Sequence, residues 1–99
     1  MAGGCVGIVS AELRFAGSRS LKDKRQFLRS TKAQLQRRFG ASVAEVDHHD
    51  AWQRSRLTVA CTAVDHRSLE QLLDGVERFL ASQEYELSSV YREVVVPEA

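Results

Sequence analysis

Residues 17–40 read GSRSLKDKRQFLRSTKAQLQRRFG and predict the long helix around which the chain is organised. Ser20 is a candidate N-cap, because its hydroxyl can accept a hydrogen bond from a free backbone N–H in the first turn. Gly40 is a stop signal, since glycine accepts the left-handed conformation that ends many helices. We therefore expect a helix from about residue 21 to residue 39. Its apolar stripe follows helical spacing: Leu21, Phe27, Leu28, Thr31, Leu35 and Phe39.

The same stretch carries most of the positive charge. Between residues 19 and 38 there are eight basic residues and one acidic residue, Asp23, so the segment has a formal charge of +7. The whole chain is only +1, so the remaining residues sum to −6. This polarisation along the chain is the most informative functional hint in the sequence.

Length and composition indicate one soluble domain spanning residues 1–99. No apolar run approaches the roughly 20 residues that cross a bilayer, so we expect no membrane partner. The chain starts without a basic leader, and no signal peptide is predicted. Cys5 and Cys61 lie in apolar strand patterns, which favours buried free thiols and a cytoplasmic location. A disulfide between adjacent strands is the alternative.

Alternating residues predict three strands in the first two thirds of the chain. Residues 5–15 place Gly7, Val9, Ala11, Leu13 and Phe15 on one face. Residues 42–49 and 52–64 predict a hairpin with a tight turn at Asp50-Ala51. The expected register sets Asp47 opposite Arg54 and Glu45 opposite Arg56, as opposite-charge pairs on the polar face. Leu57, Val59, Cys61 and Ala63 would then share the apolar face with Ala44 and Val46.

A second helix and a last strand complete the prediction. The helix is expected over residues 66–82, with Asp65 as its N-cap or Ser68 and Gln71 as a competing capping box. The strand is expected over residues 85–96. The order strand, helix, strand, strand, helix, strand fits a ferredoxin-like βαββαβ fold of the α+β class. Right-handed crossovers give an antiparallel sheet in the order 4-1-3-2, with both helices on one face.

Two stretches are similar to a known family. RSLKDKRQFLRS at residues 19–30 and SVAEVDHHDAWQR at residues 42–54 resemble the YlxP-like family of small bacterial proteins, a domain of unknown function. The similarity of pattern extends from about residue 6 to residue 95. The resemblance implies a ferredoxin-like fold and a cytoplasmic protein. Family members are often encoded beside translation initiation and ribosome-maturation factors, which implies a link to the ribosome. It supplies no catalytic residues.

The charge pattern predicts a nucleic-acid interface on the first helix. Several exposed cations on one face can displace counterions from RNA phosphates, so ribosomal RNA or a ribosomal subunit is the expected partner. The alternative is a solvated helix face whose charge is balanced internally by Glu70, Asp74 and Glu77 of the second helix. The candidate RNA-binding residues are Arg19, Lys22, Lys24, Arg25, Arg29, Lys32 and Arg38.

The hairpin carries a polar motif to which we assign no role. It consists of Asp47, His48, His49, Asp50 and Trp52. Neighbouring strand residues point to opposite faces, so the two histidines are not expected to chelate a metal together. We also find no catalytic constellation and no glycine-rich phosphate loop, so we predict neither an enzyme nor a cofactor.

The sequence supports two further predictions about the sheet. RNA-recognition domains of this topology stack bases on aromatic residues of the central strands, and the first and third strands here carry none. RNA contacts should therefore go to phosphates or to duplex shape. The last strand, with Tyr91 and a valine run, is expected at an edge of the sheet and could pair with a second subunit. A homo-oligomeric interaction module without nucleic acid is thus the alternative function.

Overall fold

The computed structural model describes residues 3–97, which form four strands and two helices. In chain order these are β1 (Cys5–Arg14), α1 (Leu21–Phe39), β2 (Ser42–Asp47), β3 (Arg54–Ala63), α2 (His66–Ala81) and β4 (Glu86–Val95). The expected bounds of α1 are confirmed, and the other elements agree within two residues at each end.

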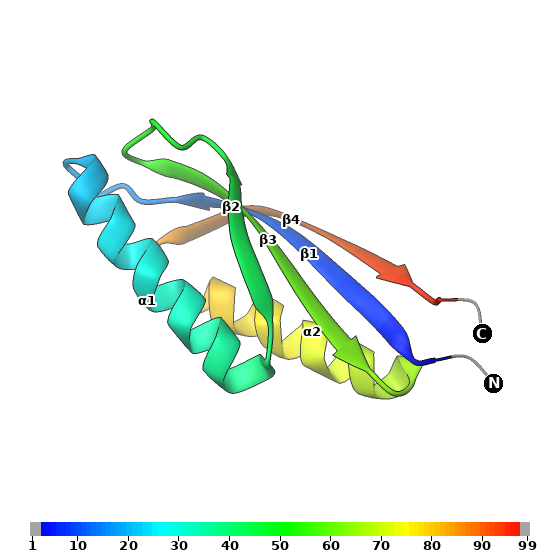
Figure 1. The fold of residues 1–99 in the computed structure, drawn as a ribbon. Helices are drawn as coiled ribbons and strands as arrows, with labels where there is room; N and C mark the ends of the chain where they lie inside the picture. The colour runs from blue at the N-terminus through cyan, green and yellow to red at the C-terminus, as the bar shows by residue number, and fades with distance from the viewer. Residues whose placement is uncertain (1–2, 98–99) are drawn as a thin grey trace.

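The four strands form one antiparallel sheet in the order β2-β3-β1-β4. Both helices lie on the same side of this sheet (Figure 1). This is the ferredoxin-like topology expected from the sequence, because the order 4-1-3-2 describes the same sheet read from its other edge. The other face of the sheet is left uncovered by helices.

Local signals at both ends fix the position of α1. The Ser20 hydroxyl accepts a hydrogen bond from the Asp23 backbone N–H at 3.1 Å, which confirms the predicted N-cap. The Asp23 carboxylate accepts in turn from the Arg19 N–H at 3.0 Å. At the other end Gly40 has a φ of 61°, and its N–H closes the last turn on Gln36. Both caps satisfy backbone groups that a helix end would otherwise leave without partners.

The core lies between the sheet and the two helices. The predicted inward faces of β1 and β3 are confirmed, and the predicted Asp65 cap of α2 accepts from the Ser68 N–H at 2.7 Å. A methyl group at Gly7 would lie 2.6 Å from a terminal carbon of Leu73, so glycine lets α2 approach β1 closely. The largest fully buried apolar side chains are Phe15, Leu13, Leu35, Leu57, Leu69, Leu73, Leu80, Val9, Val59 and Val76.

Strand β2 differs from the prediction in its register with β3 and in which of its side chains point to the core. Glu45 pairs with Leu57, and Asp47 with Arg56, because Val46 is an extra residue that shifts the register between them. Val43 packs against the core, whereas Val46 is exposed. The expected placement of Ala44, Val46 and Glu45 was therefore wrong. The expected pairing of Asp47 with Arg54 and the two-residue turn were wrong as well. A six-residue loop, 48–53, joins the strands instead.

Strand β4 forms the sheet edge beside β1. Leu87 and Val94 pack against the core, and Arg92 contacts carboxylates of α2. Glu12 of β1 pairs with Ser89 and Leu13 pairs with Leu87, so Ser88 is an extra residue that forms a bulge in β4. The outer face exposes Tyr91. Because Arg92 reaches the carboxylates of α2, the side chain that precedes it in the strand points to the uncovered face.

Candidate nucleic-acid interface

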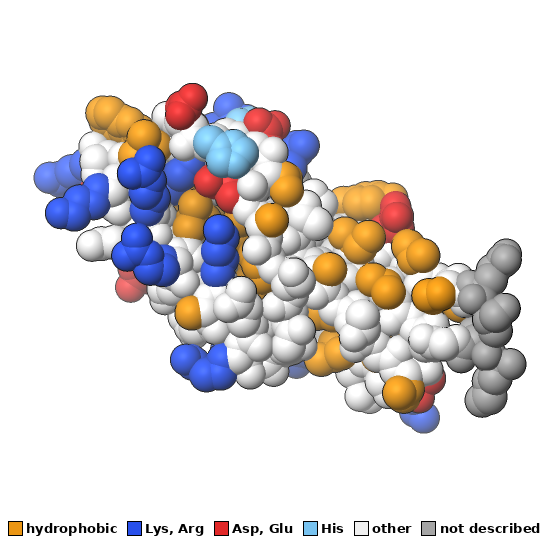
Figure 2. Space-filling view, in the orientation of Figure 1, with side chains coloured by type: hydrophobic (Ala, Val, Ile, Leu, Met, Phe, Trp, Pro, Cys, Tyr) orange, Lys and Arg blue, Asp and Glu red, His pale blue; other side chains and the backbone are white. Residues whose placement is uncertain are grey.

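A row of cations runs along the outer side of α1. Lys22, Arg25, Arg29 and Lys32 follow one another at spacings of three and four residues, which places them on one side of a helix. The first three are exposed and Lys32 is half-buried. None of them, nor Arg19, forms an ion pair within residues 3–97. Figure 2 shows Lys and Arg side chains gathered over α1 and the adjoining end of the molecule.

The acidic side chains of α2 do not neutralise this row. The Arg92 guanidinium of β4 lies 2.8 Å from Glu70, 2.9 Å from Asp74 and 2.6 Å from Glu77. These are the three carboxylates that could have balanced α1 internally. Because all three contact one arginine on the neighbouring strand, the cations of α1 remain on the surface without these counter-charges.

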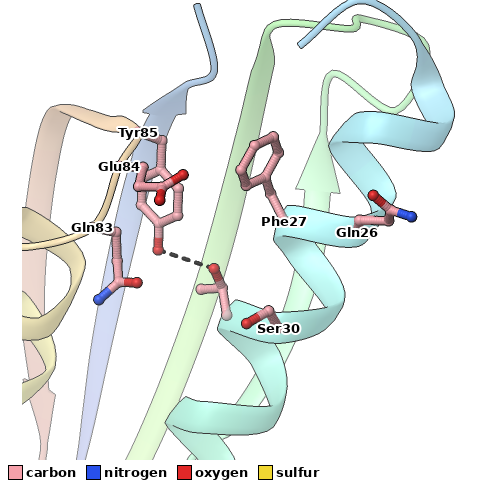
Figure 3. A pocket seen from close by; sticks show the side chains of 7 residues that line it. Gln26, Phe27, Ser30, Gln83, Glu84 and Tyr85 are labelled. Atoms are coloured by element: carbon pink, nitrogen blue, oxygen red, sulfur yellow. Dashed lines mark hydrogen bonds between the residues drawn. The ribbon is translucent and has the colours of Figure 1, made fainter. Parts of the chain in front are cut away.

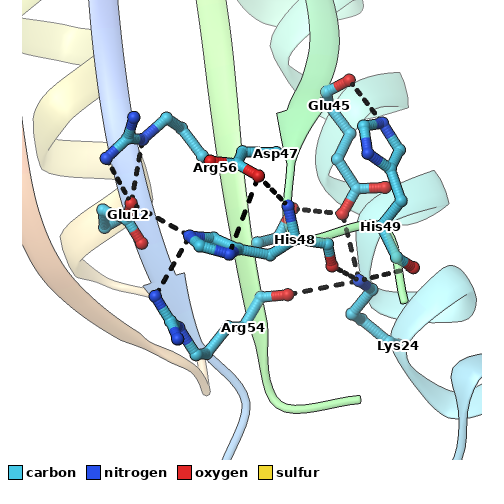
Figure 4. Close-up of polar contacts among 9 residues, drawn as sticks. Glu12, Lys24, Glu45, Asp47, His48, His49, Arg54 and Arg56 are labelled. Carbon is cyan, nitrogen blue, oxygen red and sulfur yellow. Dashed lines mark hydrogen bonds and ion pairs between the residues drawn. The ribbon is translucent and has the colours of Figure 1, made fainter. Parts of the chain in front are cut away.

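Lys24 does not belong to the exposed row, and its inclusion among the candidates was wrong. Only 1% of its surface is exposed, because the side chain extends beneath the β2–β3 loop (Figure 4). Its Nζ lies 3.1 Å from a Glu45 carboxylate oxygen. It also donates to three backbone carbonyls, those of His48 (2.8 Å), Arg54 (3.2 Å) and His49 (3.4 Å). A buried ammonium with four oxygen partners cannot also bind a phosphate.

Arg38 lies apart from the row as well. Its guanidinium packs 5.0 Å from the centre of the Phe79 ring and 5.4 Å from that of Phe39. It is exposed, but it stands at the α2 side of the last turn of α1. A helix rises about 1.5 Å per residue, so Arg38 lies about 25 Å along the axis from the start of α1. The candidate interface is thus concentrated on the first three turns.

The uncovered sheet face adds cations that the sequence analysis did not select. Arg14 of β1 and Arg54 of β3 are direct cross-strand partners, and both are exposed. Like charges in this position destabilise a sheet by a few tenths of a kcal/mol to about 1 kcal/mol. The alternation of β1 and β3 places both arginines on the polar face, but only the β1–β3 register brings them together.

The predicted hairpin motif is divided between two environments. The Asp47 carboxylate accepts from the His48 backbone N–H at 2.7 Å, and this hydrogen bond lowers the pKa of Asp47, with a further contribution from the nearby His48 ring. His48 has a φ of 64°, and its ring lies beside Glu12 of β1 and Arg54 of β3 (Figure 4). Its Nε2 lies 3.1 Å from the Arg54 guanidinium and 3.4 Å from Glu12. Arginine can only donate and a carboxylate can only accept, so Nε2 hydrogen-bonds one of these groups at a time, as an acceptor with Arg54 or as a donor with Glu12.

The two histidines of this motif point apart. The His49 Nε2 lies 3.2 Å from the Glu45 carbonyl oxygen, away from the His48 ring. Within residues 3–97 no group of three His, Cys, Asp or Glu side chains is placed to hold a metal ion. Asp50 and Trp52 are exposed in the same loop.

Ser55, Glu45 and Lys24 form a polar triad that resembles the activated hydroxyl of a catalytic site, but solvent does not reach the Ser55 hydroxyl. The Ser55 hydroxyl donates to Glu45 at 2.6 Å, and Lys24 contacts the same carboxylate oxygen. Ser55 and Lys24 are 0% and 1% exposed. Because no substrate can reach this hydroxyl in the folded protein, the triad serves to hold the hairpin.

A groove of about 310 Å³ separates α1 from the segment that joins α2 to β4 (Figure 3). Phe27 and Tyr85 face its interior, and the Tyr85 hydroxyl is hydrogen-bonded to Thr31 at 3.0 Å. Burial raises the pKa of Tyr85, although the hydrogen bond opposes the shift. Glu84 is its only charged lining residue, so the groove is poorly suited to an anionic ligand.

Sequence comparisons agree with this architecture. A family described as "Protein of unknown function (DUF503)" matches residues 6–92. The chain belongs to the DUF503 family. It is 29% identical over 77 residues to the "Uncharacterized protein YlxP" of Bacillus subtilis strain 168, an alignment that covers 78% of this chain and 84% of the relative. Among the described residues, no helix of this DUF503 protein has the length and apolar character needed to span a bilayer.

Proposed function

We propose that this protein is a cytoplasmic accessory factor that binds ribosomal RNA through the cationic row of α1. The observation that carries the proposal is the exposure of Lys22, Arg25 and Arg29 without carboxylate partners within residues 3–97. An RNA backbone offers a repeated negative charge that matches such a row, and binding would release condensed counterions. Glu70, Asp74 and Glu77 of α2 contact Arg92 and, in the described part of the chain, form no ion pair with the cations of the row.

Charge reversal on α1 tests this function. The double variant Arg25→Glu, Arg29→Glu should no longer co-sediment with ribosomal subunits at about 50 mM salt. Both side chains point to solvent, so the variant should keep the fold, as judged by circular dichroism. A matched control is Arg67→Glu, Arg78→Glu on α2, which changes the net charge equally and also alters exposed residues. Equal loss in both variants, or no association of the original protein, would contradict the proposal.

A second candidate function is a homo-oligomeric interaction module without nucleic acid. Strand β4 is an edge strand of ten residues, and Tyr91, Val90 and Val95 are 65%, 41% and 42% exposed. Long exposed apolar edges favour pairing with another strand. Sedimentation equilibrium at micromolar concentration tests this alternative. A dimer that Tyr91→Lys dissociates would support it, and a monomer would contradict it.

A further inference from the structure

The loop that joins β2 to β3 exposes a large aromatic ring. Trp52 is 55% exposed, and it is the only tryptophan of the sequence. Isolated apolar side chains are common on protein surfaces and carry no functional meaning by themselves. Trp52 is a candidate for ligand binding because hydrogen bonds hold its loop in place and cationic side chains lie near the loop.

One side of the loop is fixed by Lys24. Its ammonium donates to the carbonyls of His48, His49 and Arg54, which are the first two residues of the loop and the residue that follows it. Burying an ammonium is costly unless charge and hydrogen bonds compensate, and here the ion pair with Glu45 and three carbonyls do so. The loop is therefore tied to the first turn of the cationic helix.

The other side is fixed by Gln53, which follows Trp52. Its carbonyl accepts from the Phe15 N–H at 2.9 Å, and its side-chain amide donates to the carbonyls of Ala16 (3.3 Å) and Ser18 (3.1 Å). These contacts hold the loop against the segment that leads into α1. Trp52 is thus presented on an anchored backbone, which reduces the conformational entropy lost when a ligand covers the ring.

The surroundings of the ring are cationic. The Gln53 side chain is hydrogen-bonded to the Ser18 carbonyl, and Trp52 and Arg19 are the chain neighbours of these two residues. Neighbouring Cα atoms are about 3.8 Å apart, so this hydrogen bond brings the backbones of Trp52 and Arg19 near each other. Lys22 is exposed in the first turn of α1, and Arg54 and Arg14 form the like-charged pair at this end of β3 and β1. Two carboxylates are also nearby: Glu86 lies 4.0 Å from Arg14, and Asp50 is exposed in the loop. An anion placed between such groups would relieve their mutual repulsion.

We propose that Trp52 stacks on an unpaired base of RNA, while Arg19, Lys22 and Arg54 bind the phosphates on either side of that base. This inference rests on the proposed function and specifies it: the preferred ligand is a single-stranded or bulged segment rather than an uninterrupted duplex. It replaces the expectation of contacts to phosphates or duplex shape alone, which considered only the central strands and not the loop. Stacking on an aromatic ring is tolerant of sequence, because every base has a π-face. The phosphates would orient the strand, and the ring would select a base that is free to leave its stack.

The single tryptophan supplies a direct signal. Titration with an unstructured RNA of about 20 nucleotides should quench its fluorescence, because stacking places a base against the ring. A duplex of about 20 base pairs should bind through its phosphates and leave the fluorescence nearly unchanged, because its bases are already stacked. Fluorescence anisotropy of labelled RNA measures the two affinities independently of the tryptophan signal.

Substitution separates the ring from the charges. Trp52→Ala should weaken single-strand binding about tenfold or more and leave duplex binding unchanged, whereas Trp52→Phe should retain most of the affinity. Tyr91→Ala is the matched control, because it removes another highly exposed aromatic ring from the uncovered sheet face. The control should bind both RNAs as the original protein does. Circular dichroism and unfolding curves establish that each variant is folded.

The two proposals fail in distinguishable ways. If the folded protein binds neither RNA at about 50 mM salt, the proposed function fails and this inference fails with it. If both RNAs bind, but Trp52→Ala leaves single-strand affinity and selectivity unchanged, only the stacking role is overturned. A loss of single-strand affinity in Tyr91→Ala instead would overturn it too, because the sheet would then be the stacking surface.

Discussion

Lys24 of α1 and Glu45 of β2 form an ion pair of 3.1 Å inside the protein, where 1% and 14% of their side chains are exposed. This pair explains why β2 departs from simple alternation: the carboxylate turns inward to meet the ammonium, and the extra residue Val46 lies between Glu45 and Asp47. The same ammonium organises the loop that presents Trp52.

Removing one partner of this pair should strongly destabilise the fold. Lys24→Met leaves the Glu45 carboxylate without its counter-charge, and the expected loss is about 3–5 kcal/mol in the free energy of unfolding. The double variant Lys24→Met, Glu45→Leu should recover part of the loss, because no buried charge is left unpaired. Recovery stays incomplete, because the Ser55 hydroxyl and the carbonyls bonded by Lys24 lose their partners. Urea unfolding measures both. Lys22→Met, on the exposed side of the same turn, is the control and should change stability by less than about 0.5 kcal/mol.

The Tyr85 hydroxyl should make the protein sensitive to alkali. Burial raises its pKa in the folded state, so the folded protein holds the phenolic proton more tightly than the unfolded chain does. The corresponding stability is fully present below the unfolded pKa of about 10 and is lost as pH rises through the folded pKa. Tyr85→Phe removes this dependence.

Tyr85→Phe should also lower the free energy of unfolding at neutral pH. It leaves the Thr31 hydroxyl without its partner, which corresponds to about 1 kcal/mol. The stability gap between the original protein and Tyr85→Phe should then narrow as pH rises above about 10, the pKa of the phenol in the unfolded chain. Unfolding curves across this range measure the gap, and a constant gap would contradict the assignment.

Both thiols should be protected in the folded protein. Cys5 and Cys61 are free and only 5% and 2% exposed, and burial raises the pKa of Cys61. Because the thiolate is the reactive form, a thiol reagent should modify them slowly at neutral pH and at a rate set by opening of the fold. Adding urea below the unfolding midpoint should accelerate the reaction. Rapid modification in native buffer would show that these strands are not packed as described.

The close contact between β1 and α2 should not tolerate a larger residue. A methyl group at Gly7 would lie within 3.0 Å of carbons from Leu73 and Leu69, both fully buried. Gly7→Ala should therefore cost about 1–3 kcal/mol, because the packed core must shift to admit it. Gly17→Ala is the matched control, since a methyl group there meets no atom within 4 Å. Thermal unfolding compares the two, and equal midpoints would contradict the packing.

Local signals allowed most of the fold to be predicted. The cap residues Ser20, Gly40 and Asp65 act within a few residues of themselves, so the sequence alone places the helix ends. The alternation of β1 and β3 likewise reflects one buried and one polar face. The register of β2 could not be predicted in this way, because its bulge and its inward glutamate depend on a lysine twenty-one residues earlier in the chain.

The candidate site was predicted in part. The exposed row of α1 follows from charge and helical spacing, but the burial of Lys24 was missed. A signal for it exists, because Lys24, Leu28, Thr31 and Leu35 recur at spacings of four and three, and the last three form the buried stripe. The pairing of Arg92 with three carboxylates of α2 requires the placement of β4 against that helix, which no local pattern in its sequence specifies.

The salt dependence of binding to a ribosomal RNA fragment tests the central claim most directly. If Arg19, Lys22, Arg25 and Arg29 contact about four phosphates, the logarithm of the association constant should fall with the logarithm of salt concentration with a slope of about −3. Arg25→Glu, Arg29→Glu should at least halve this slope as well as weaken binding. An affinity that does not change with salt, or the absence of binding at about 50 mM salt, would contradict an electrostatic RNA interface on α1.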